Sequence, residues 1–280
     1  MKPVRRAGVV IKPHASGVAD LIIALTGYFS AKGIGVVLEQ AAAEKAGRPD
    51  GLPRDLVPSA SDLIVVLGGD GTLLSVAHQA ARAGIPVMGV NLGSLGFLTE
   101  VPVAEMELSL DALLADGTNV RPRMMLESTF RGETELALND IVLNKTARAR
   151  MIQYAVSVDG REIAKLRADG LIAATPTGST AYSLSAGGPI LHPSVPAIIL
   201  TPICPHTLSF RPTVVSSDAR IRVELRTPGE EAFLTLDGQR GGEIGGDDAI
   251  EIRKAGVELL LVTSPKRNYF GLLQEKLRWG

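Results

Sequence analysis

Leu63-Ile64-Val65-Val66-Leu67-Gly68-Gly69-Asp70-Gly71-Thr72 is the stretch that decides the fold. Its apolar first half is continuous rather than alternating, which is typical of a strand that is buried on both faces of a parallel sheet. Glycines follow at once, and a helical pattern runs from Leu73 to about Ala83, where Gly84 closes it. A strand, a glycine loop and a helix in this order predict a doubly wound α/β sheet.

The sequence on both sides of this stretch continues the same rhythm. Short apolar runs at 9–11, 35–38 and 86–90 predict further buried strands, and apolar residues recur at helical spacing over 18–29. Residues 39–61 show no clear period, so we expect a long loop that is mobile, functional or both. The first part of the chain is therefore predicted to be a Rossmann-like or phosphofructokinase-like α/β domain.

The pattern changes after about residue 121. Apolar and polar residues alternate over 152–158 and 221–225, and Asp159-Gly160 and Asp237-Gly238 are hairpin signals. Such short strands predict an all-β, sandwich-like domain, and the last dozen residues return to a helical pattern with one apolar side. We expect an α/β domain at 1–120, a β-rich domain at 121–262, and a C-terminal helix at 263–280 that docks back on the first domain.

Composition narrows the class of protein. The 280 residues include 29 Lys and Arg against 30 Asp and Glu, a near-balance that argues against general nucleic-acid binding. No apolar stretch approaches the length of a membrane span, and the apolar run at 7–11 is shorter than a signal peptide requires. The single cysteine, Cys204, excludes an internal disulfide and is expected in the core; the four histidines show no metal-ligand spacing. These features favour a cytoplasmic protein without nucleic-acid or membrane partners.

The glycine loop carries the first chemical signal. Gly68, Gly69 and Gly71 permit positive φ and a close approach of the backbone to a ligand, and the following helix offers free N–H groups to phosphate oxygens. Asp70 repels phosphates unless it holds a metal ion or accepts a proton from an attacking hydroxyl. The alternative is a glycine turn in which Asp70 is only the helix N-cap. A second glycine loop at 91–97 also follows a buried strand and is expected at the same sheet edge.

Two further segments carry polar groups suited to a nucleotide. Asn139-Asp140 interrupts the apolar stretch 136–143, and adjacent strand residues point to opposite faces, so one of them should face inward or into a cleft. An amide can pair with an adenine edge and a carboxylate can accept from ribose hydroxyls; the alternative is a solvated edge-strand bulge. Over 168–189 a strand enters a loop rich in hydroxyls, where Tyr182 can stack on a base. An ordinary hydroxyl-rich loop capping a helix is the alternative there.

Together these motifs carry a resemblance to a known family. Gly69-Asp70-Gly71-Thr72, Asn139-Asp140 and Thr175-Pro176-Thr177-Gly178-Ser179-Thr180-Ala181-Tyr182 resemble the order and spacing of the bacterial NAD kinases. The likeness continues through 187–193, 200–206 and 237–239, and it is weak before residue 60. Gly-Gly-Asp-Gly is shared with diacylglycerol-type lipid kinases and phosphofructokinases, whereas the longer run is far more diagnostic.

The resemblance implies phosphoryl transfer from ATP, or inorganic polyphosphate, to the 2′-hydroxyl of the adenosine ribose of NAD, giving NADP. It implies Mg²⁺ on the donor phosphates and Asp70 as the proton acceptor, with Gly71 beside it. Asn139 and Asp140 would hold adenine and ribose. Arg167 and Asp169 are similar to positions near the nicotinamide end, and Asp169 would serve a neighbouring subunit in a homodimer or homotetramer.

Further nucleotide contacts are expected from the glycine loop and by resemblance. They are Gly68, Gly69, Thr72, Arg150, Thr177, Thr180, Ala181, Tyr182, Ser183, Leu184, Ser185 and Gln239. For Arg150, a merely solvated basic turn with Lys145 and Arg148 is an equal alternative, and Asp140 stands where many relatives have Glu. The alternative functions are a lipid kinase and a non-catalytic NAD-binding regulator. The choices between ATP and polyphosphate, NAD and NADH, and dimer and tetramer stay open at this stage.

Overall fold

The predicted central strand is β3 (Leu63–Gly68), which is buried at every residue, as is β4 (Pro86–Asn91). In the computed structural model these strands join a parallel sheet in the order β2-β1-β3-β4, with β1 at Arg6–Ile11 and β2 at Gly35–Leu38. The far edge of β4 pairs with the end of β17 at Leu260–Val262 and then with β5 (Val101–Pro102). This arrangement confirms the predicted α/β sheet.

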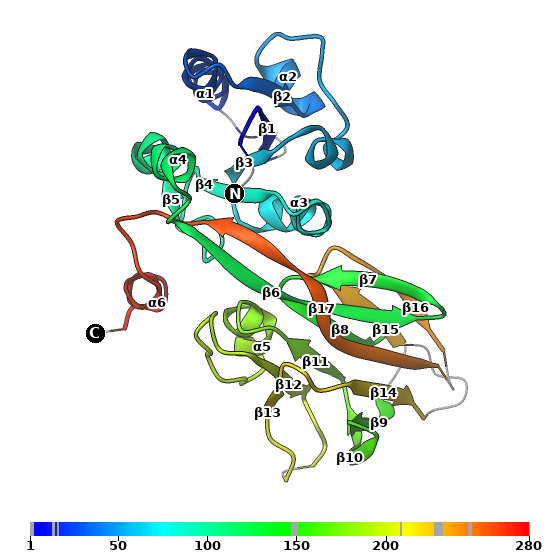
Figure 1. Cartoon of the computed structure of the whole chain (residues 1–280). Helices are drawn as coiled ribbons and strands as arrows, with labels where there is room; N and C mark the ends of the chain where they lie inside the picture. The colour runs from blue at the N-terminus through cyan, green and yellow to red at the C-terminus, as the bar shows by residue number, and fades with distance from the viewer. Residues whose placement is uncertain are drawn as a thin grey trace. The chain divides into compact units, whose positions relative to one another are not determined.

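The structure describes residues 3–12, 15, 17–146, 151–207, 209–226, 232–245 and 248–279. The chain divides into two compact units, the first of Met1–Pro122 with Glu258–Gly280 and the second of Arg123–Val257. Figure 1 shows the elements of each unit along the chain.

The first unit also contains helices. They are α1 (Ala19–Ala31), α2 (Gln40–Lys45), α3 (Asp70–Ala83), α4 (Met106–Ala115) and α6 (Tyr269–Leu277), with the short helix η3 at Val103–Glu105. The glycine-loop helix α3 ends as predicted, at Gly84 in the left-handed conformation with φ of 65°. The C-terminal helix α6 buries Leu272 and Leu273, in line with the predicted docking face.

The prediction of a long loop at 39–61 is wrong. This segment contains α2 and the short helices η1 (Arg54–Leu56) and η2 (Pro58–Ala60). Ala42 and Ala43 are buried, and a Cβ at Gly51 would lie 2.6 Å from the Cα of Gln40, so the segment folds tightly on itself. Helices this short leave no repeating apolar pattern in the sequence, so apolar periodicity could not predict them.

The second unit is a β sandwich, as predicted. One sheet has the antiparallel order β13-β12-β11-β8-β15-β16, and the other contains β10-β9-β14-β17 together with β6 and β7. Inward residues of both sheets, such as Leu143, Leu171, Val156 and Val223, form one apolar core. The strands are β6 (Val120–Phe130), β7 (Glu133–Ala137), β8 (Asp140–Lys145), β9 (Ile152–Val158), β10 (Arg161–Ala168), β11 (Gly170–Ala174), β12 (Ala197–Ile203), β13 (Thr213–Ser216), β14 (Ile221–Leu225), β15 (Ala232–Leu236), β16 (Arg240–Ile244) and β17 (Ala249–Val262).

Both predicted hairpins are confirmed. Asp159 and Gly160 have φ of 50° and 76° between β9 and β10, and Asp237 and Gly238 have φ of 52° and 65° before β16. Positive φ at both central residues is the signature of the turn that matches strand twist.

The apolar stretch 136–143 is not a single strand. It supplies the end of β7, which pairs with β6 in one sheet, and the start of β8, which lies between β11 and β15 in the other. The chain therefore crosses between sheets at Leu138-Asn139, and the solvated edge-strand alternative is wrong because Asp140 is buried in a central strand.

Cys204 also departs from expectation. It is exposed, with φ of 45°, because it lies in the turn directly after β12 rather than in the core. No helix in the described part of the chain has the length and apolar character needed to cross a bilayer.

Candidate functional site

A pocket of about 300 Å³ lies where β1, β3 and β4 end. Its lining comes from the two glycine loops and from the residues after β1, namely Lys12, Ala15, Gly68, Gly69, Asn91, Leu92, Gly93 and Ser94. The two loops thus lie together at the carboxyl edge of the sheet, where open α/β folds bind ligands.

The glycines of the first loop act through size rather than through unusual φ. None of Gly68, Gly69 and Gly71 has a positive φ, so the loop does not use the left-handed conformations that glycine permits. A Cβ on Gly68 would lie 2.8 Å from Thr72 Oγ1, whereas Cβ atoms on Gly69 and Gly71 would meet nothing within 4 Å. Gly69 therefore presents bare backbone to the pocket, with open space in front of it.

The carboxylate of Asp70 is fixed by the second loop. Its Oδ1 accepts hydrogen bonds from the N–H groups of Leu98 and Thr99 at 3.1 and 2.9 Å and from Thr99 Oγ1 at 2.8 Å. Among the described residues, its Oδ2 accepts only the Phe97 N–H, at 2.9 Å. Since a carboxylate oxygen has about two lone-pair sites, Oδ2 retains capacity for one more donor. The N-cap alternative is wrong, because Gly69 is the N-cap of α3 and no side chain caps the helix.

Two residues shape the second loop around Asp70. A Cβ at Gly96 would lie 2.1 Å from Asp70 Oδ1 and 2.3 Å from Thr99 Oγ1, so only glycine leaves room for the carboxylate. Asn91, at the end of β4, accepts the Gly93 N–H at 2.6 Å and donates to the Ser94 carbonyl. The asparagine thus folds the loop that lines the pocket.

A second pocket, of about 270 Å³, lies in the sandwich unit. Its lining combines three separate segments of the sequence and consists of Asn139, Asp140, Val142, Asn144, Ala181, Tyr182, Thr235, Asp237 and Gly238. Asn139 and Asp140 line the same pocket rather than opposite faces, because Asn139 precedes the strand. Four residues predicted to contact nucleotide, Asn139, Asp140, Ala181 and Tyr182, are therefore brought together.

The crossing at Leu138-Asn139 is held by groups from two other motifs. The Asp237 carboxylate accepts the N–H groups of Leu138, Asn139 and Asp140 at 2.9, 2.7 and 3.2 Å. Thr175 Oγ1 donates to the Leu138 carbonyl at 2.6 Å, and its N–H donates to that of Asn139. Asp237 was not predicted as a site residue, because Asp237-Gly238 signals a hairpin turn and only Gln239 was carried over from the 237–239 run of the resemblance.

The two carboxylates of this pocket are electrostatically coupled. Burial, followed by the charge of Asp237, raises the pKa of Asp140 to about 7, and the backbone N–H of Tyr182 offsets part of that rise. Burial also raises the pKa of Asp237, while the three backbone N–H groups act in the opposite direction. Asp140 therefore titrates near neutrality.

The remaining residues of 177–185 divide between pocket and interior. Tyr182 is 42% exposed at the pocket rim, and the buried Thr177 hydroxyl has no hydrogen-bond partner among the described residues. Ser183 is fully buried, with its hydroxyl 3.0 Å from that of Thr201, and Thr180 bonds back to the Thr177 carbonyl. Neither pocket has Ser183, Leu184 or Ser185 in its lining.

The other predicted contacts lie elsewhere. Arg167 is exposed on β10. Asp169 follows the last residue of that strand and forms an ion pair with Lys145 at 2.9 Å. Lys145 is the last residue of β8. Gln239 is exposed in the β15–β16 turn, and Arg150 and Arg148 lie outside the described residues.

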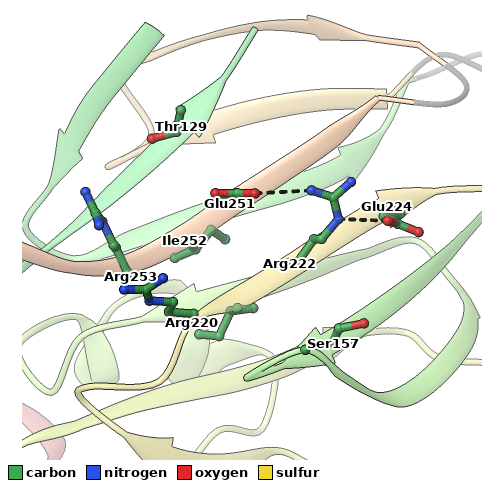
Figure 2. A pocket seen from close by; sticks show the side chains of 10 residues that line it. Thr129, Ser157, Arg220, Arg222, Glu224, Glu251, Ile252 and Arg253 are labelled. Carbon is green, nitrogen blue, oxygen red and sulfur yellow. Dashed lines mark hydrogen bonds and ion pairs between the residues drawn. The ribbon is translucent and has the colours of Figure 1, made fainter. Parts of the chain in front are cut away.

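A larger hollow in the sandwich unit holds none of the motif residues. It has a volume of about 490 Å³ and is lined by residues such as Ser157, Arg220 and Arg253. Figure 2 shows Arg222 between Glu224 and Glu251, to which it donates at 2.7 and 3.2 Å. The charges of Arg222, Glu224 and Glu251 are paired with one another. The larger volume of this hollow therefore does not by itself mark it as the binding site.

The residues also bear on metal binding. Among the described residues, no group of three or more His, Cys, Asp or Glu side chains is placed to hold a metal ion. A divalent cation held mostly by substrate phosphates and water, with at most one or two carboxylates, is compatible with this donor set.

An α/β unit with a glycine loop and a poised carboxylate, joined to a sandwich with a polar pocket, defines a nucleotide-binding phosphotransferase. A model of the ATP-NAD kinase N-terminal domain matches residues 8–118, and a model of the ATP-NAD kinase C-terminal domain matches residues 138–264. The chain belongs to the NAD kinase family, and its reaction is phosphoryl transfer from ATP to NAD. The lipid-kinase and regulator alternatives are therefore wrong.

Individual relatives agree over their whole length. The chain is 45% identical to the NAD kinases of Geotalea daltonii and Geobacter sulfurreducens, covering 100% of this chain and 99% of each relative. Among solved structures it is similar to yeast NADH kinase complexed with NADH (TM-score 0.91, 27% identity, 100% of this chain and 89% of that one). It is also similar to an Archaeoglobus fulgidus NAD kinase in complex with ATP (TM-score 0.80, 30% identity, 96% and 99% covered).

Proposed function

We propose that Asp70 is the catalytic base of this NAD kinase and that the acceptor is the 2′-hydroxyl of the adenosine ribose. The observation that carries this assignment is the asymmetry of the Asp70 carboxylate, whose Oδ1 accepts three hydrogen bonds and whose Oδ2 accepts one. A substrate hydroxyl would donate to Oδ2 and transfer its proton there as the phosphoryl group arrives. Because phosphoryl transfer depends mainly on positioning and charge neutralisation, a rigidly held carboxylate suits it.

The polar pocket of the sandwich unit is proposed to bind the adenosine half of NAD. Asp140 would accept from ribose hydroxyls, the Asn139 amide would pair with an adenine edge, and the exposed ring of Tyr182 would stack on the base. The unsatisfied Thr177 hydroxyl is a further candidate contact. Arg167, Asp169 and Gln239 remain proposals from the family resemblance, since neither pocket includes them.

Mg²⁺ is proposed to arrive with the donor. Its chemistry when bound is to neutralise charge on the phosphate oxygens. Asp70 is the carboxylate at the glycine loop, and the described residues form no cage of their own for a metal ion. The pocket backbone at Gly69 would hold a phosphate oxygen through its N–H group.

Replacing Asp70 tests the base. Asp70→Asn should still bind NAD, because the other proposed adenosine contacts line the pocket of the sandwich unit, but NADP formation from NAD, ATP and Mg²⁺ should fall at least about a hundredfold. Asp55→Asn, which removes an exposed carboxylate of η1, is the matched control. Turnover close to that of the unaltered chain, in a folded Asp70→Asn protein, would sink the assignment.

Oligomeric state and location are proposals as well. Asp169 is proposed to complete the nicotinamide site of a neighbouring subunit, which implies a homodimer or homotetramer. A cytoplasmic location suits an enzyme whose substrates, ATP and NAD, are held inside the cell.

A further inference from the structure

At the end of β1, the backbone of Ile11 forms hydrogen bonds with side chains where a neighbouring strand would otherwise pair. The β2 strand pairs with β1 only as far as Leu38 opposite Val9, so the N–H and carbonyl of Ile11 extend beyond it on that edge. Side chains replace the missing strand. Glu39 Oε1 accepts the Ile11 N–H at 2.6 Å, and Arg54 Nη2 donates to the Ile11 carbonyl at 2.8 Å.

These two side chains form a two-pronged ion pair. Arg54 Nε lies 2.7 Å from Glu39 Oε2 and Nη2 lies 3.1 Å from Oε1, with Glu39 only 3% exposed. Arg54 Nη1 also donates to Ser75 Oγ at 3.2 Å, and Ser75 Oγ donates to the Thr72 carbonyl in the first turn of α3. The pair therefore ties the end of β1 to the helix that follows the glycine loop.

The energetics of such a pair point to a positioning role. Glu39 is buried and Arg54 is 28% exposed, and the desolvation cost of such a pair commonly cancels much of its attraction, so the pair is weak grounds for stability alone. Its fixed bidentate geometry does, however, define where the attached backbone lies. Here the attached backbone is Ile11, and the next residue is Lys12.

Lys12 lies at the pocket of the glycine loops. Its N–H donates to the Leu67 carbonyl at the end of β3, and its side chain lines the pocket with Gly69 and Asn91. Among the described residues that line the pocket it alone carries a charge, and these residues show no hydrogen bond or ion pair to its exposed ammonium group. A triphosphate in this pocket would meet backbone N–H groups and the ammonium group of Lys12.

We propose that Lys12 binds the phosphate chain of the donor and that Glu39 and Arg54 are positioning residues for Lys12. This inference rests on the proposed role of the glycine-loop pocket as the donor site. Because the pair is neutral overall, it anchors the strand without competing for the phosphates.

Steady-state kinetics with both substrates varied test the role of Lys12. Lys12→Met should raise KM for ATP at least about tenfold, since a charge-assisted hydrogen bond is lost, and should leave KM for NAD unchanged. Lys12→Arg should restore most of the ATP affinity. Lys45→Met, at an exposed lysine of α2, is the matched control. A KM for ATP that does not change in Lys12→Met overturns the proposal.

A double-mutant cycle tests the positioning pair. Glu39→Gln should raise KM for ATP in the unaltered chain but cause no further rise in the Lys12→Met background. An equal rise in both backgrounds would show a general structural role and refute the coupling. If Glu39→Gln does not fold, Arg54→Lys, which keeps the charge and loses the fork, takes its place in the cycle.

Calorimetric titration separates this proposal from the proposed function. The probe is inorganic tripolyphosphate with Mg²⁺, added to the unaltered chain and to Lys12→Met. Weaker binding to Lys12→Met supports the Lys12 site even if no NADP forms, whereas equal binding overturns it even if the enzyme is active.

Discussion

At the scale of single residues, the contact between Gly96 and Asp70 makes a sharp prediction. A Cβ at residue 96 would overlap the carboxylate, which four hydrogen bonds otherwise hold in place. Gly96→Ala should therefore cost about 1 to 3 kcal/mol of stability through overpacking. NADP formation should fall along with it, because Asp70 is displaced.

Gly27→Ala provides the comparison, since a Cβ there meets nothing within 4 Å and the residue is exposed on α1. Thermal unfolding and initial rates of the two variants are to be measured side by side. Equal activity of Gly96→Ala and Gly27→Ala would show that the carboxylate tolerates movement.

The raised pKa of Asp140 predicts that the stability of the folded protein depends on pH. Its pKa is raised to about 7 in the folded chain, against an ordinary value of 3.8. The folded state therefore holds this proton more tightly than the unfolded state, and the group lowers stability progressively as pH rises from about 4 to about 7. Asp140→Asn removes that penalty, so its stability gain should be larger at pH 8 than at pH 5.

Urea unfolding of both proteins at the two pH values measures this difference. A gain that is the same at pH 5 and pH 8 would contradict the raised pKa. The affinity for NAD should fall in Asp140→Asn at pH 8, where Asp140 is a carboxylate, because the amide offers ribose hydroxyls a weaker acceptor.

At the scale of elements, the β15–β16 hairpin holds the start of β8 in place through the hydrogen bonds that Asp237 accepts. In Asp237→Asn the amide NH₂ would face one of the three N–H groups at the sheet crossing, leaving a buried donor unsatisfied at a cost of about 1 to 3 kcal/mol. We expect a higher KM for NAD and an unchanged KM for ATP. Asp218→Asn, at an exposed site before β14, is the control, and equal KM values for NAD in the two variants would refute this role.

Sequence patterns predicted elements wherever a period or a turn signal was strong. β3, α3 and the Asp159-Gly160 hairpin were all foreseen because each has its own local signature. The segment 39–61 was not, because its helices are too short to show a period and contacts such as the ion pair between Glu39 and Arg54 are encoded by no local pattern.

The residues of the candidate site also divide into those that the sequence predicted and those that it did not. Asn139-Asp140 and Tyr182 were predicted as residue types suited to a nucleotide, and the structure places them at one pocket. The groups that hold them, Asp237 and Thr175, were not, since their importance lies in hydrogen bonds to backbone 37 or more positions away. Partners so distant in sequence appear only once the sheets are assembled.

At the scale of the whole molecule, the proposed assembly predicts a dependence on concentration. If Asp169 serves a neighbouring subunit, activity per chain should fall as the protein is diluted to monomer. Sedimentation and rate measurements over the same dilution series check this. Constant activity in a demonstrated monomer would show that Asp169 acts only within its own chain, where it already pairs with Lys145.

The first unit has a consequence for how the protein is made. It is assembled from both ends of the sequence, Met1–Pro122 and Glu258–Gly280, so the ribosome completes it last. Until Leu260–Val262 emerges, that stretch of the edge of β4 lacks its partner in a nascent chain whose other strands are already available. An open strand edge of this kind invites pairing with another chain. Translation speed and chaperone supply should therefore affect the yield of this protein more than the stability of the finished fold would indicate.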